Sequence, residues 1–351
     1  METIKLGISL GDINGIGIET IVKTFLDKEM LEFCTPIAYG STRVTSYHRK
    51  VLGINDWSFN GIKRAEEANP KLANMVQLWD EEVPIALGQS TPEAGKYALS
   101  SLTAAVEDLK QGKIDVLVTA PINKNNIQGP DFNFPGHTEY LANAFATKDY
   151  MMLLVSDNLR VGLVTGHVPL ANVAREITQE KINARLRVMN QSLIKDFGIR
   201  KPRIAVLGLN PHSGDNGTIG KEESEIIIPA INRAYSEQIL AFGPYSSDGF
   251  FGSGQYTQFD GVLAMYHDQG LTPFKAISFD QGVNYTAGLP IVRTSPDHGT
   301  AYDIAGKNVA SEHSFRQAVF LAIDIYRQRN HHDEINANPL KISKQKREYE
   351  R

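Results

Sequence analysis

The residues best suited to chemistry lie between positions 261 and 307. An apolar run at 262–266 is short enough for one buried strand, and His267 and Asp268 follow it directly. The polar side chains that come next, interspersed with glycines, are Lys275, Asn284, Arg293, Asp297 and His298. Glycine lets the backbone approach a ligand closely, and ligands of open α/β sheets sit outside the carboxyl ends of the strands. We interpret this stretch as the wall of an active site.

Three histidines share one context, because each follows an apolar run typical of a buried strand. His167 follows VGLVTG, His212 follows IAVLGLNP and His267 follows VLAMY. Three neutral imidazoles with an open position suit a catalytic divalent metal such as zinc. Their wide spacing carries no metal-ligand signature, so a metal site and three separate loop histidines remain equally good interpretations here. His48 has polar neighbours and is predicted to lie on a solvated helix face.

Two further segments are candidates for binding an anion. The glycine-rich stretch 11–17 follows the first predicted strand and precedes a helix, where free backbone N–H groups can meet a phosphate. His137 and Thr138 precede a helix predicted over 140–146 and add side-chain donors there. A tight turn without a ligand in the first case, and an ordinary helix cap in the second, explain each pattern equally well.

The elements that must position these residues alternate between strand and helix. Strands are expected at 4–10, 36–40, 76–79, 114–119, 151–155, 160–165, 204–209 and 262–266. Helices are expected from the Thr91-Pro92 cap to Gly112, over 171–197, 222–237 and 313–327, and 245–256 is expected to be a loop. This alternation predicts an α/β fold with a mainly parallel sheet covered by helices.

The composition of the 351 residues is that of an ordinary globular protein, with 42% hydrophobic and 22% charged residues. A formal net charge of -4 gives no electrostatic case for nucleic acid or an anionic membrane as a partner. Cys34 is the single cysteine, so no internal disulfide can form. No apolar run approaches the roughly 20 residues that span a bilayer, and no signal peptide precedes the first strand. We therefore expect a cytoplasmic protein.

Seven segments, in order, carry a resemblance that covers nearly the whole chain. They are GDINGIGIE, VTAPINK, PGHTEYLA, VTGHVPL, GLNPHSGDNGTIGKEE, AMYHDQGLTPFK and VNYTAGLPIVRTSPDHGTAYDIAGK. The chain resembles the 4-hydroxythreonine-4-phosphate dehydrogenase family of vitamin B6 synthesis. It departs from that family in the first segment, with Ile13-Asn14 in place of Pro-Ala and Ile18 in place of Pro. We expect the loss of a helix-starting proline to loosen this turn.

The resemblance implies a fold like that of isocitrate and isopropylmalate dehydrogenases. Two α/β/α domains with mainly parallel sheets would enclose an active-site cleft. Residues 1–125 and 290–351 would form the cofactor-side domain, and 126–289 the domain for substrate, metal and dimer contact. The resemblance further implies a homodimer with the active site at the subunit interface.

The resemblance also implies an activity. NAD would oxidise 4-phosphooxy-L-threonine to 2-amino-3-oxo-4-phosphooxybutanoate, and loss of carbon dioxide would give 3-amino-2-oxopropyl phosphate. The implied metal ligands are His167, His212 and His267, holding zinc in the first place, or magnesium, manganese or cobalt. The implied substrate contacts are His137, Thr138, Lys275, Asn284 and Arg293. The candidates for proton transfer or other catalytic work are Lys275, Asp268 and Asp248, and the sequence does not choose the general base among them.

The cofactor is expected at the loop that begins near Asp297. Its implied contacts are His298, Gly299, Thr300, Ala301 and Asp303. The loop 297–303 contains no Arg or Lys to meet a 2′-phosphate, so NAD is preferred to NADP. Three alternatives remain: a sister dehydrogenase for another phosphorylated hydroxy acid, such as a four-carbon sugar acid phosphate, a phosphate acyltransferase, and a non-catalytic binding protein.

Overall fold

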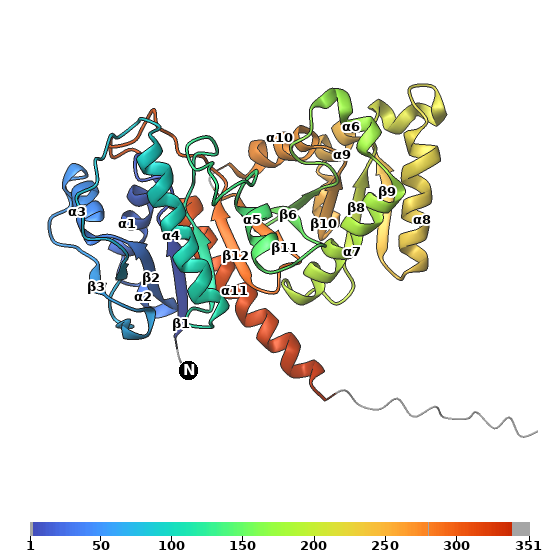
Figure 1. Ribbon diagram of the computed structural model, residues 1–351. Coiled ribbons are helices and arrows are strands. Elements are labelled where there is room, and N and C mark those ends of the chain that lie inside the picture. Colours follow the sequence, from blue (N-terminus) through green and yellow to red (C-terminus); the bar gives the residue numbers. More distant parts are fainter. Residues whose placement is uncertain (1–2, 280, 339–351) are drawn as a thin grey trace, which may run out of the picture.

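A single mixed sheet runs through the molecule (Figure 1). The computed structural model describes residues 3–279 and 281–338. The described strands are β1 (Ile4–Ser9), β2 (Cys34–Gly40), β3 (Asn60–Ile62), β4 (Asn74–Gln77), β5 (Val116–Thr119), β6 (Met151–Ser156), β7 (Leu159–Leu163), β8 (Arg203–Leu207), β9 (Leu240–Tyr245), β10 (Gly261–Ala264), β11 (Val283–Ala287) and β12 (Val292–Pro296). Their order across the sheet is β3-β4-β2-β1-β5-β12-β11-β6-β7-β10-β8-β9.

The strands are parallel within each half of the sheet and antiparallel at its centre. β12 pairs antiparallel with β11, β11 with β6, and β6 with β7. The other pairings of these strands are parallel. The predicted mainly parallel α/β sheet is thus confirmed. Because three antiparallel steps reverse the direction, the carboxyl ends of β5 and β12 point opposite to those of β7, β10 and β8.

Helices cover both faces of this sheet, as an α/β/α architecture requires. The α-helices are α1 (Gly17–Leu26), α2 (Met30–Phe33), α3 (Thr42–Val51), α4 (Pro92–Lys110), α5 (His137–Ala144), α6 (Leu170–Glu176), α7 (Gln179–Lys195), α8 (Ile228–Ser236), α9 (Ser247–Gly252), α10 (His267–Ser278) and α11 (His313–Asn336). One core lies beneath α1, α7 and α11. Two smaller cores lie beneath α4 with α5, and beneath α10. Along β5, Val116 and Val118 belong to the first core and Leu117 to the second, and along β6 Leu153 belongs to the first core and Leu154 to the third. Since side chains alternate between the faces of a strand, α4, α5 and α10 share the face opposite to the first core.

The predicted domain division at 125/126 and 289/290 stays a prediction. β12 hydrogen-bonds to β5 on one side and to β11 on the other, so the sheet is continuous across the second of these boundaries. In Figure 1 the strands β1 to β4 and the strands β8 and β9 lie at opposite ends of the molecule. Among the described helices, none is long and apolar enough to cross a membrane.

Two predicted elements differ from the structure for local reasons. The helix expected over 171–197 is two helices, α6 and α7, because Ile177 is extended and the Thr178 hydroxyl caps α7 by accepting from the Lys181 N–H at 3.2 Å. The loop expected over 245–256 contains the short helix α9 and a 3₁₀ turn that begins at Gln255. Neither change alters the strands that carry the candidate residues.

The turn between β1 and α1 is tighter than expected. Every residue from Gly11 to Thr20 is buried. The Asn14 side chain donates to the Gln89 carbonyl at 3.0 Å and the Thr91 hydroxyl at 3.1 Å, and it accepts from the Ala86 N–H at 2.9 Å. These bonds and this burial hold the turn without a proline, and they speak against the expected loosening.

His48 is also placed differently from its prediction. It is 3% exposed, and its Nε2 lies 2.8 Å from the carbonyl oxygen of Ile13. The polar neighbours in the sequence lie on other sides of α3, whereas His48 points at the buried turn. Burial lowers the pKa of His48 to about 4, against the opposing effect of the Ile13 carbonyl.

We expect His48 to make the fold acid-sensitive. The unfolded chain binds a proton at this residue near pH 6.5 and the folded chain only near pH 4. The contribution of the neutral His48 to the free energy of unfolding is therefore fully present above pH 6.5. It falls by roughly 3 kcal/mol as the pH drops toward 4. Urea unfolding at several pH values gives the free energy of unfolding as a function of pH. Between pH 6.5 and 4 this free energy should fall less steeply with pH for His48→Gln than for wild type. The same pH dependence in both proteins would contradict this role.

Candidate active site

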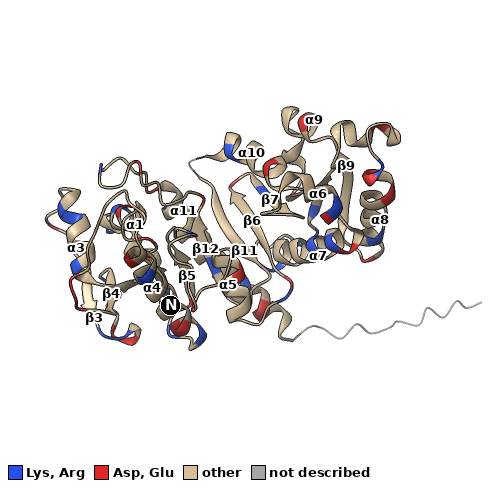
Figure 2. Cartoon of the chain, turned by 45° about the horizontal axis from the view of Figure 1, so that its top comes forward, with Lys and Arg blue, Asp and Glu red and all other residues tan. Residues whose placement is uncertain are grey.

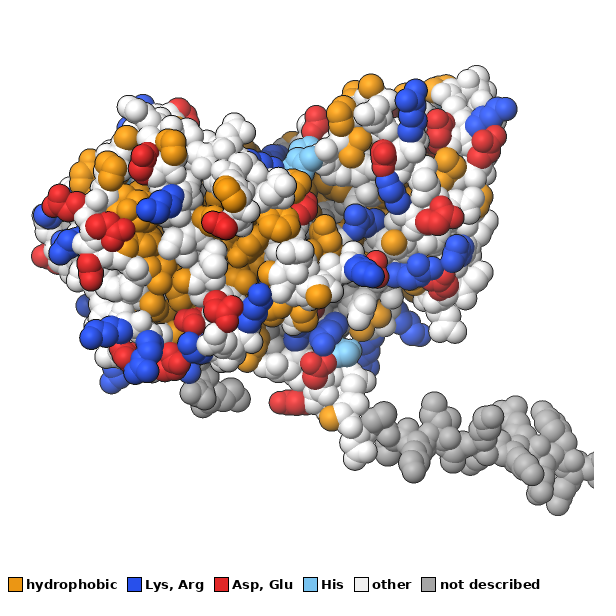
Figure 3. Space-filling view, viewed as in Figure 1, with side chains coloured by type: hydrophobic (Ala, Val, Ile, Leu, Met, Phe, Trp, Pro, Cys, Tyr) orange, Lys and Arg blue, Asp and Glu red, His pale blue; other side chains and the backbone are white. Residues whose placement is uncertain are grey.

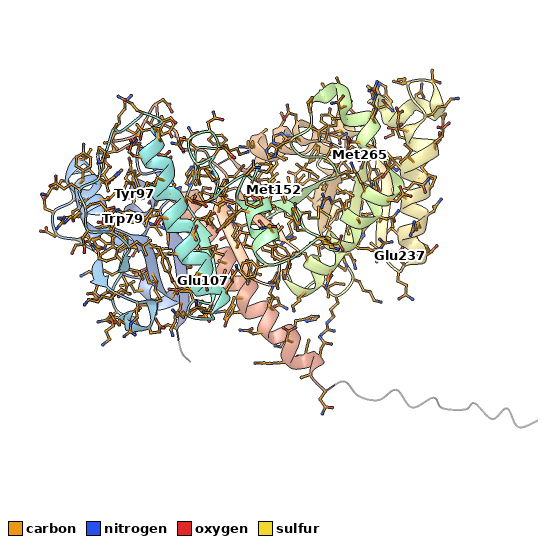
Figure 4. All side chains as sticks on the ribbon, in the orientation of Figure 1. Trp79, Tyr97, Glu107, Met152, Glu237 and Met265 are labelled. Carbon is orange, nitrogen blue, oxygen red and sulfur yellow. The ribbon has the colours of Figure 1, made fainter. Side chains whose placement is uncertain are left out.

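A pocket of about 590 Å³ crosses the sheet face that α5 and α10 flank. Figure 2 shows β6 and β11 in the centre of the molecule, between these two helices. In Figure 3 the surface is hollowed between the two halves, with basic and histidine side chains at the edge of the hollow. Met152, labelled on β6 in Figure 4, is part of its apolar floor. The pocket therefore takes residues from both halves of the sheet, at the carboxyl ends of β5 and β12 and of β7 and β10.

Most of the predicted site residues meet in this pocket. Those that line it are His137, Thr138, His167, His267, Lys275, Asn284, Arg293, His298 and Gly299. Those that do not line it are His212, Asp248, Asp268, Thr300, Ala301 and Asp303. Sequence reasoning gave no role to Lys124, Glu139 and Arg185, which also line it, and it placed Asp297, another lining residue, in the active-site stretch and the expected cofactor loop. For Lys124 the available signal was its place just after a buried strand, and for Glu139 its place in the first turn of a helix.

Arg293 is a buried cation on β12, with 2% of its surface exposed. Its guanidinium donates to the Thr119 hydroxyl at 2.6 and 3.0 Å and to the Thr286 hydroxyl at 3.3 Å. Within residues 3–279 and 281–338 it forms no salt bridge. Burial lowers its pKa to about 9, with Glu139 opposing, so the group stays charged at neutral pH. A buried charge with only neutral partners is costly, and an anionic ligand would remove that cost.

Three buried polar atoms of pocket residues lack a hydrogen-bond partner among the described residues. They are Nε2 of His137, Oδ1 of Asn284 and Nε2 of His298. Unpaired buried polar atoms are rare and cost about 1–3 kcal/mol each. All three belong to one cavity, so a single polar ligand can satisfy them together. This convergence indicates a binding site and not a packing defect.

His137 contributes a hydrogen bond to this site and not a charge. Burial, followed by the neighbouring Arg293 and Lys124, lowers its pKa well below 6.5. The ring is therefore neutral at physiological pH, with one nitrogen free to donate or accept. It lies at the first residue of α5, where backbone N–H groups are also free.

Among the three candidates for proton transfer, Lys275 alone lines the pocket. Its Nζ lies 3.4 Å from Oδ2 of Asp297. Burial raises the pKa of Asp297, and Lys275 opposes this. The Asp268 side chain is 81% exposed and lies 2.7 Å from Nδ1 of His267, so it is placed to orient that ring. The Asp248 carboxylate accepts from the Ser246 hydroxyl at 2.6 Å, outside the pocket.

Two of the three strand-end histidines face each other. The rings of His167 and His267 have centroids 5.8 Å apart, and Nε2 of His167 lies 3.4 Å from Nζ of Lys124. Burial, then Lys124 and His267, lower the pKa of His167, so its ring is neutral as a metal ligand must be.

His212 leaves the neighbouring strand β8 but does not join this pair. It begins a run of left-handed residues, with φ of 53°. In the described part of the chain, no three His, Cys, Asp or Glu side chains are grouped to hold an ion. A single chain thus offers two fitting ligands, and the three-histidine site stays a prediction.

The loop expected to bind the cofactor borders the same pocket. His298 and Gly299 line it, and Nδ1 of His298 lies 3.0 Å from the Gly299 carbonyl oxygen. Beyond them the chain turns away, with Ala301 in a left-handed conformation at φ 44° and Asp303 exposed. The loop therefore leads from the pocket toward the turn between β1 and α1, where the Ile16 N–H donates to the Thr300 carbonyl at 3.0 Å.

Known proteins resemble this chain along most of its length. The family model described as pyridoxal phosphate biosynthetic protein PdxA matches residues 32–322. The 4-hydroxythreonine-4-phosphate dehydrogenase of Bacteroides thetaiotaomicron is 53% identical over 339 residues, covering 96% of this chain and 93% of the relative. A protein of Oceanobacillus iheyensis, provisionally named D-threonate 4-phosphate dehydrogenase, is 40% identical, covering 91% and 97%. The solved structure of 4-hydroxythreonine-4-phosphate dehydrogenase from Klebsiella pneumoniae has a TM-score of 0.79 at 32% identity, covering 93% and 98%.

Proposed function

This chain belongs to the family of the pyridoxal phosphate biosynthetic protein PdxA, and from that premise we propose that it is a 4-hydroxythreonine-4-phosphate dehydrogenase. It would oxidise 4-phosphooxy-L-threonine at its secondary alcohol and release carbon dioxide from the resulting β-keto acid. The observation that carries this proposal is the buried Arg293, which faces a pocket with no carboxylate paired to it among the described residues. A phosphorylated substrate supplies the missing anion.

We assign pocket residues to the groups of this substrate by their charge and hydrogen-bonding capacity. Arg293 suits the phosphate, because a guanidinium fork can bind two oxygens at once. The neutral His137 and the Asn284 amide can hydrogen-bond to the polar groups beside it. Lys124 carries a second positive charge for the carboxylate, and Glu139 is an acceptor for the ammonium group. These pairings place both charged ends of the substrate against charges of opposite sign.

NAD and a divalent metal ion complete the reaction that we propose. The metal would supply Lewis acidity at the alcohol and at the later ketone, and NAD would take up the hydride. His167 and His267 would hold the ion, and zinc suits their imidazole nitrogens, although magnesium, manganese or cobalt remain alternatives. His298 and Gly299, with Thr300, Ala301 and Asp303 beyond them, would contact NAD. Lys275, whose ammonium group lies beside the buried Asp297, would hold or pass the proton near the reacting carbon.

We further propose that the protein acts as a homodimer with its active site at the subunit interface. The reason is that one chain brings together His167 and His267 but leaves His212 outside their pocket. Mixing inactive His212→Ala with inactive His167→Ala/His267→Ala should restore some activity, because a mixed dimer regains one complete ligand set. If the chains are shown to exchange and no activity returns, the ion is not shared between subunits.

A sister activity on a four-carbon sugar acid phosphate is the second candidate, and the Oceanobacillus relative is the observation that favours it. Such a substrate carries a hydroxyl where 4-phosphooxy-L-threonine carries an ammonium group. Parallel measurement of kcat/KM for the two substrates with NAD decides between them. Higher kcat/KM for the amino acid supports the proposed function, and the reverse supports the sister activity. A phosphate acyltransferase is not supported, since the relatives reported above are dehydrogenases by name. A cytoplasmic location remains a prediction from the sequence.

A further inference from the structure

The glycine-rich turn between β1 and α1 packs against the protein's own backbone. None of its residues lines the pocket, and all of them are buried. Its glycines lie against protein backbone: a Cβ at Gly11 would be 2.3 Å from the Pro121 oxygen, and one at Gly15 would be 2.7 Å from the Thr300 oxygen. Of the two interpretations given for residues 11–17, this packing favours the tight turn.

Asp12 is the buried centre of this turn, with 1% of its surface exposed. One carboxylate oxygen accepts from the Asn14 N–H at 2.9 Å. The other accepts from the Asn126 amide at 2.8 Å and from the Tyr302 hydroxyl at 2.7 Å. No lysine or arginine among the described residues forms a salt bridge with it. The negative charge is stabilised by neutral donors alone, so each donor carries a large share of that stabilisation.

Tyr302 belongs to the loop that we propose for NAD, and this loop rests on the turn. The Ile16 N–H donates to the Thr300 carbonyl at 3.0 Å. The Gly88 N–H donates to the Asn14 carbonyl at 2.9 Å, and a Cβ at Gly88 would be 2.8 Å from the Tyr302 oxygen. The loop therefore touches the turn and its neighbouring segment at several points. Of these, only the Tyr302 hydroxyl reaches a charged group.

From these contacts we infer that Asp12 is a positioning residue for the cofactor, acting through its hydrogen bond to Tyr302. Without this bond the loop from His298 to Asp303 keeps its backbone contacts but loses its link to a buried charge. The loop then samples conformations that do not fit NAD. Affinity for NAD falls, while Arg293 on β12, His267 on α10 and His167 after β7 keep their places. The inference rests on the proposed function, because it takes NAD as the ligand of this loop.

The variant that tests this is Tyr302→Phe, which removes one hydroxyl and leaves the ring. Its matched control is Tyr326→Phe, because the Tyr326 hydroxyl donates to the Asp115 carboxylate at 3.1 Å, on a helix outside the cofactor loop. Asp12→Asn is a second variant with the same expected direction. Calorimetric titration with NAD gives the dissociation constant, and steady-state rates separate kcat from the KM values.

For Tyr302→Phe we expect the dissociation constant and the KM for NAD to rise by roughly tenfold. The kcat at saturating NAD and the KM for the phosphorylated substrate should stay within about twofold of wild type, and the control should bind NAD normally. Unchanged NAD affinity in Tyr302→Phe, or an equal rise in the control, overturns the inference. A wild-type protein that binds NAD but oxidises no phosphorylated hydroxy acid instead overturns the proposed function, and the calorimetric result then still decides the role of Asp12.

Discussion

Replacing His167 or His267 by alanine should abolish turnover while leaving the fold intact. The two rings face each other across the pocket with centroids 5.8 Å apart, and neither side chain is buried in the fold. Loss of either ligand should release the ion and lower kcat by about a thousandfold or more, since a bound ion contributes several kcal/mol of charge stabilisation. The same loss is expected for His212→Ala if a partner subunit supplies that ligand. Rates, metal content and thermal unfolding should be measured on the same samples.

His313→Ala is the matched control, because His313 is exposed at the start of α11. It should keep full activity and full metal content. Full activity in His167→Ala or His267→Ala, with metal removed from the protein, would show that these histidines hold no catalytic ion.

Arg293→Ala should weaken capture of the phosphorylated substrate by roughly tenfold to a few hundredfold, since a hydrogen bond to a charged partner contributes about 1.5–3 kcal/mol. The effect should fall on kcat/KM for the substrate and leave NAD binding nearly unchanged. Arg293→Lys should recover only part of the loss, because an ammonium group keeps the charge but cannot bridge Thr119, Thr286 and a phosphate as the guanidinium fork can.

Arg329 provides a control for this experiment, because it is a largely buried arginine that is already paired with a carboxylate. Its guanidinium pairs with the Asp196 carboxylate at 2.7 Å and with the Tyr285 hydroxyl at 2.8 Å. Arg329→Ala should destabilise the fold and leave the KM for substrate unchanged. If Arg293→Ala behaves like Arg329→Ala, with lower stability and normal substrate binding, Arg293 is a structural residue and the phosphate lies elsewhere.

The residues that meet in the pocket could be predicted because they follow strands or begin helices. His167 and His267 follow the neighbouring parallel strands β7 and β10, and parallel neighbours bring their carboxyl ends to one edge. The alternation of apolar runs also predicted most of the strands that order them, but it missed β3, β9 and the central strands β11 and β12, which carry Asn284 and Arg293. Arg293, by contrast, is a charged residue within a central strand. Its assignment as a substrate contact came from the resemblance and not from its local pattern.

Other features depend on packing that local sequence does not reveal. Gly270 and Pro273 disfavour a helix, yet α10 forms around them because Leu271 and Phe274 bury their side chains against β7 and β10. His48 has polar neighbours but faces a buried carbonyl from a distant segment. The bond between Asp12 and Tyr302 joins residues that are 290 positions apart. No spacing rule predicts such a contact.

The central claim is that this pocket oxidises a phosphorylated amino acid with NAD and a metal ion. The most direct test is to incubate the protein with 4-phosphooxy-L-threonine and NAD and to follow NADH and carbon dioxide together, with and without a chelator. We predict that both form in equal amounts, that the chelator stops both, and that added zinc or cobalt restores them. NADH formation at the full rate in chelated protein would contradict the metal assignment. The absence of NADH in metal-loaded protein would contradict the function itself.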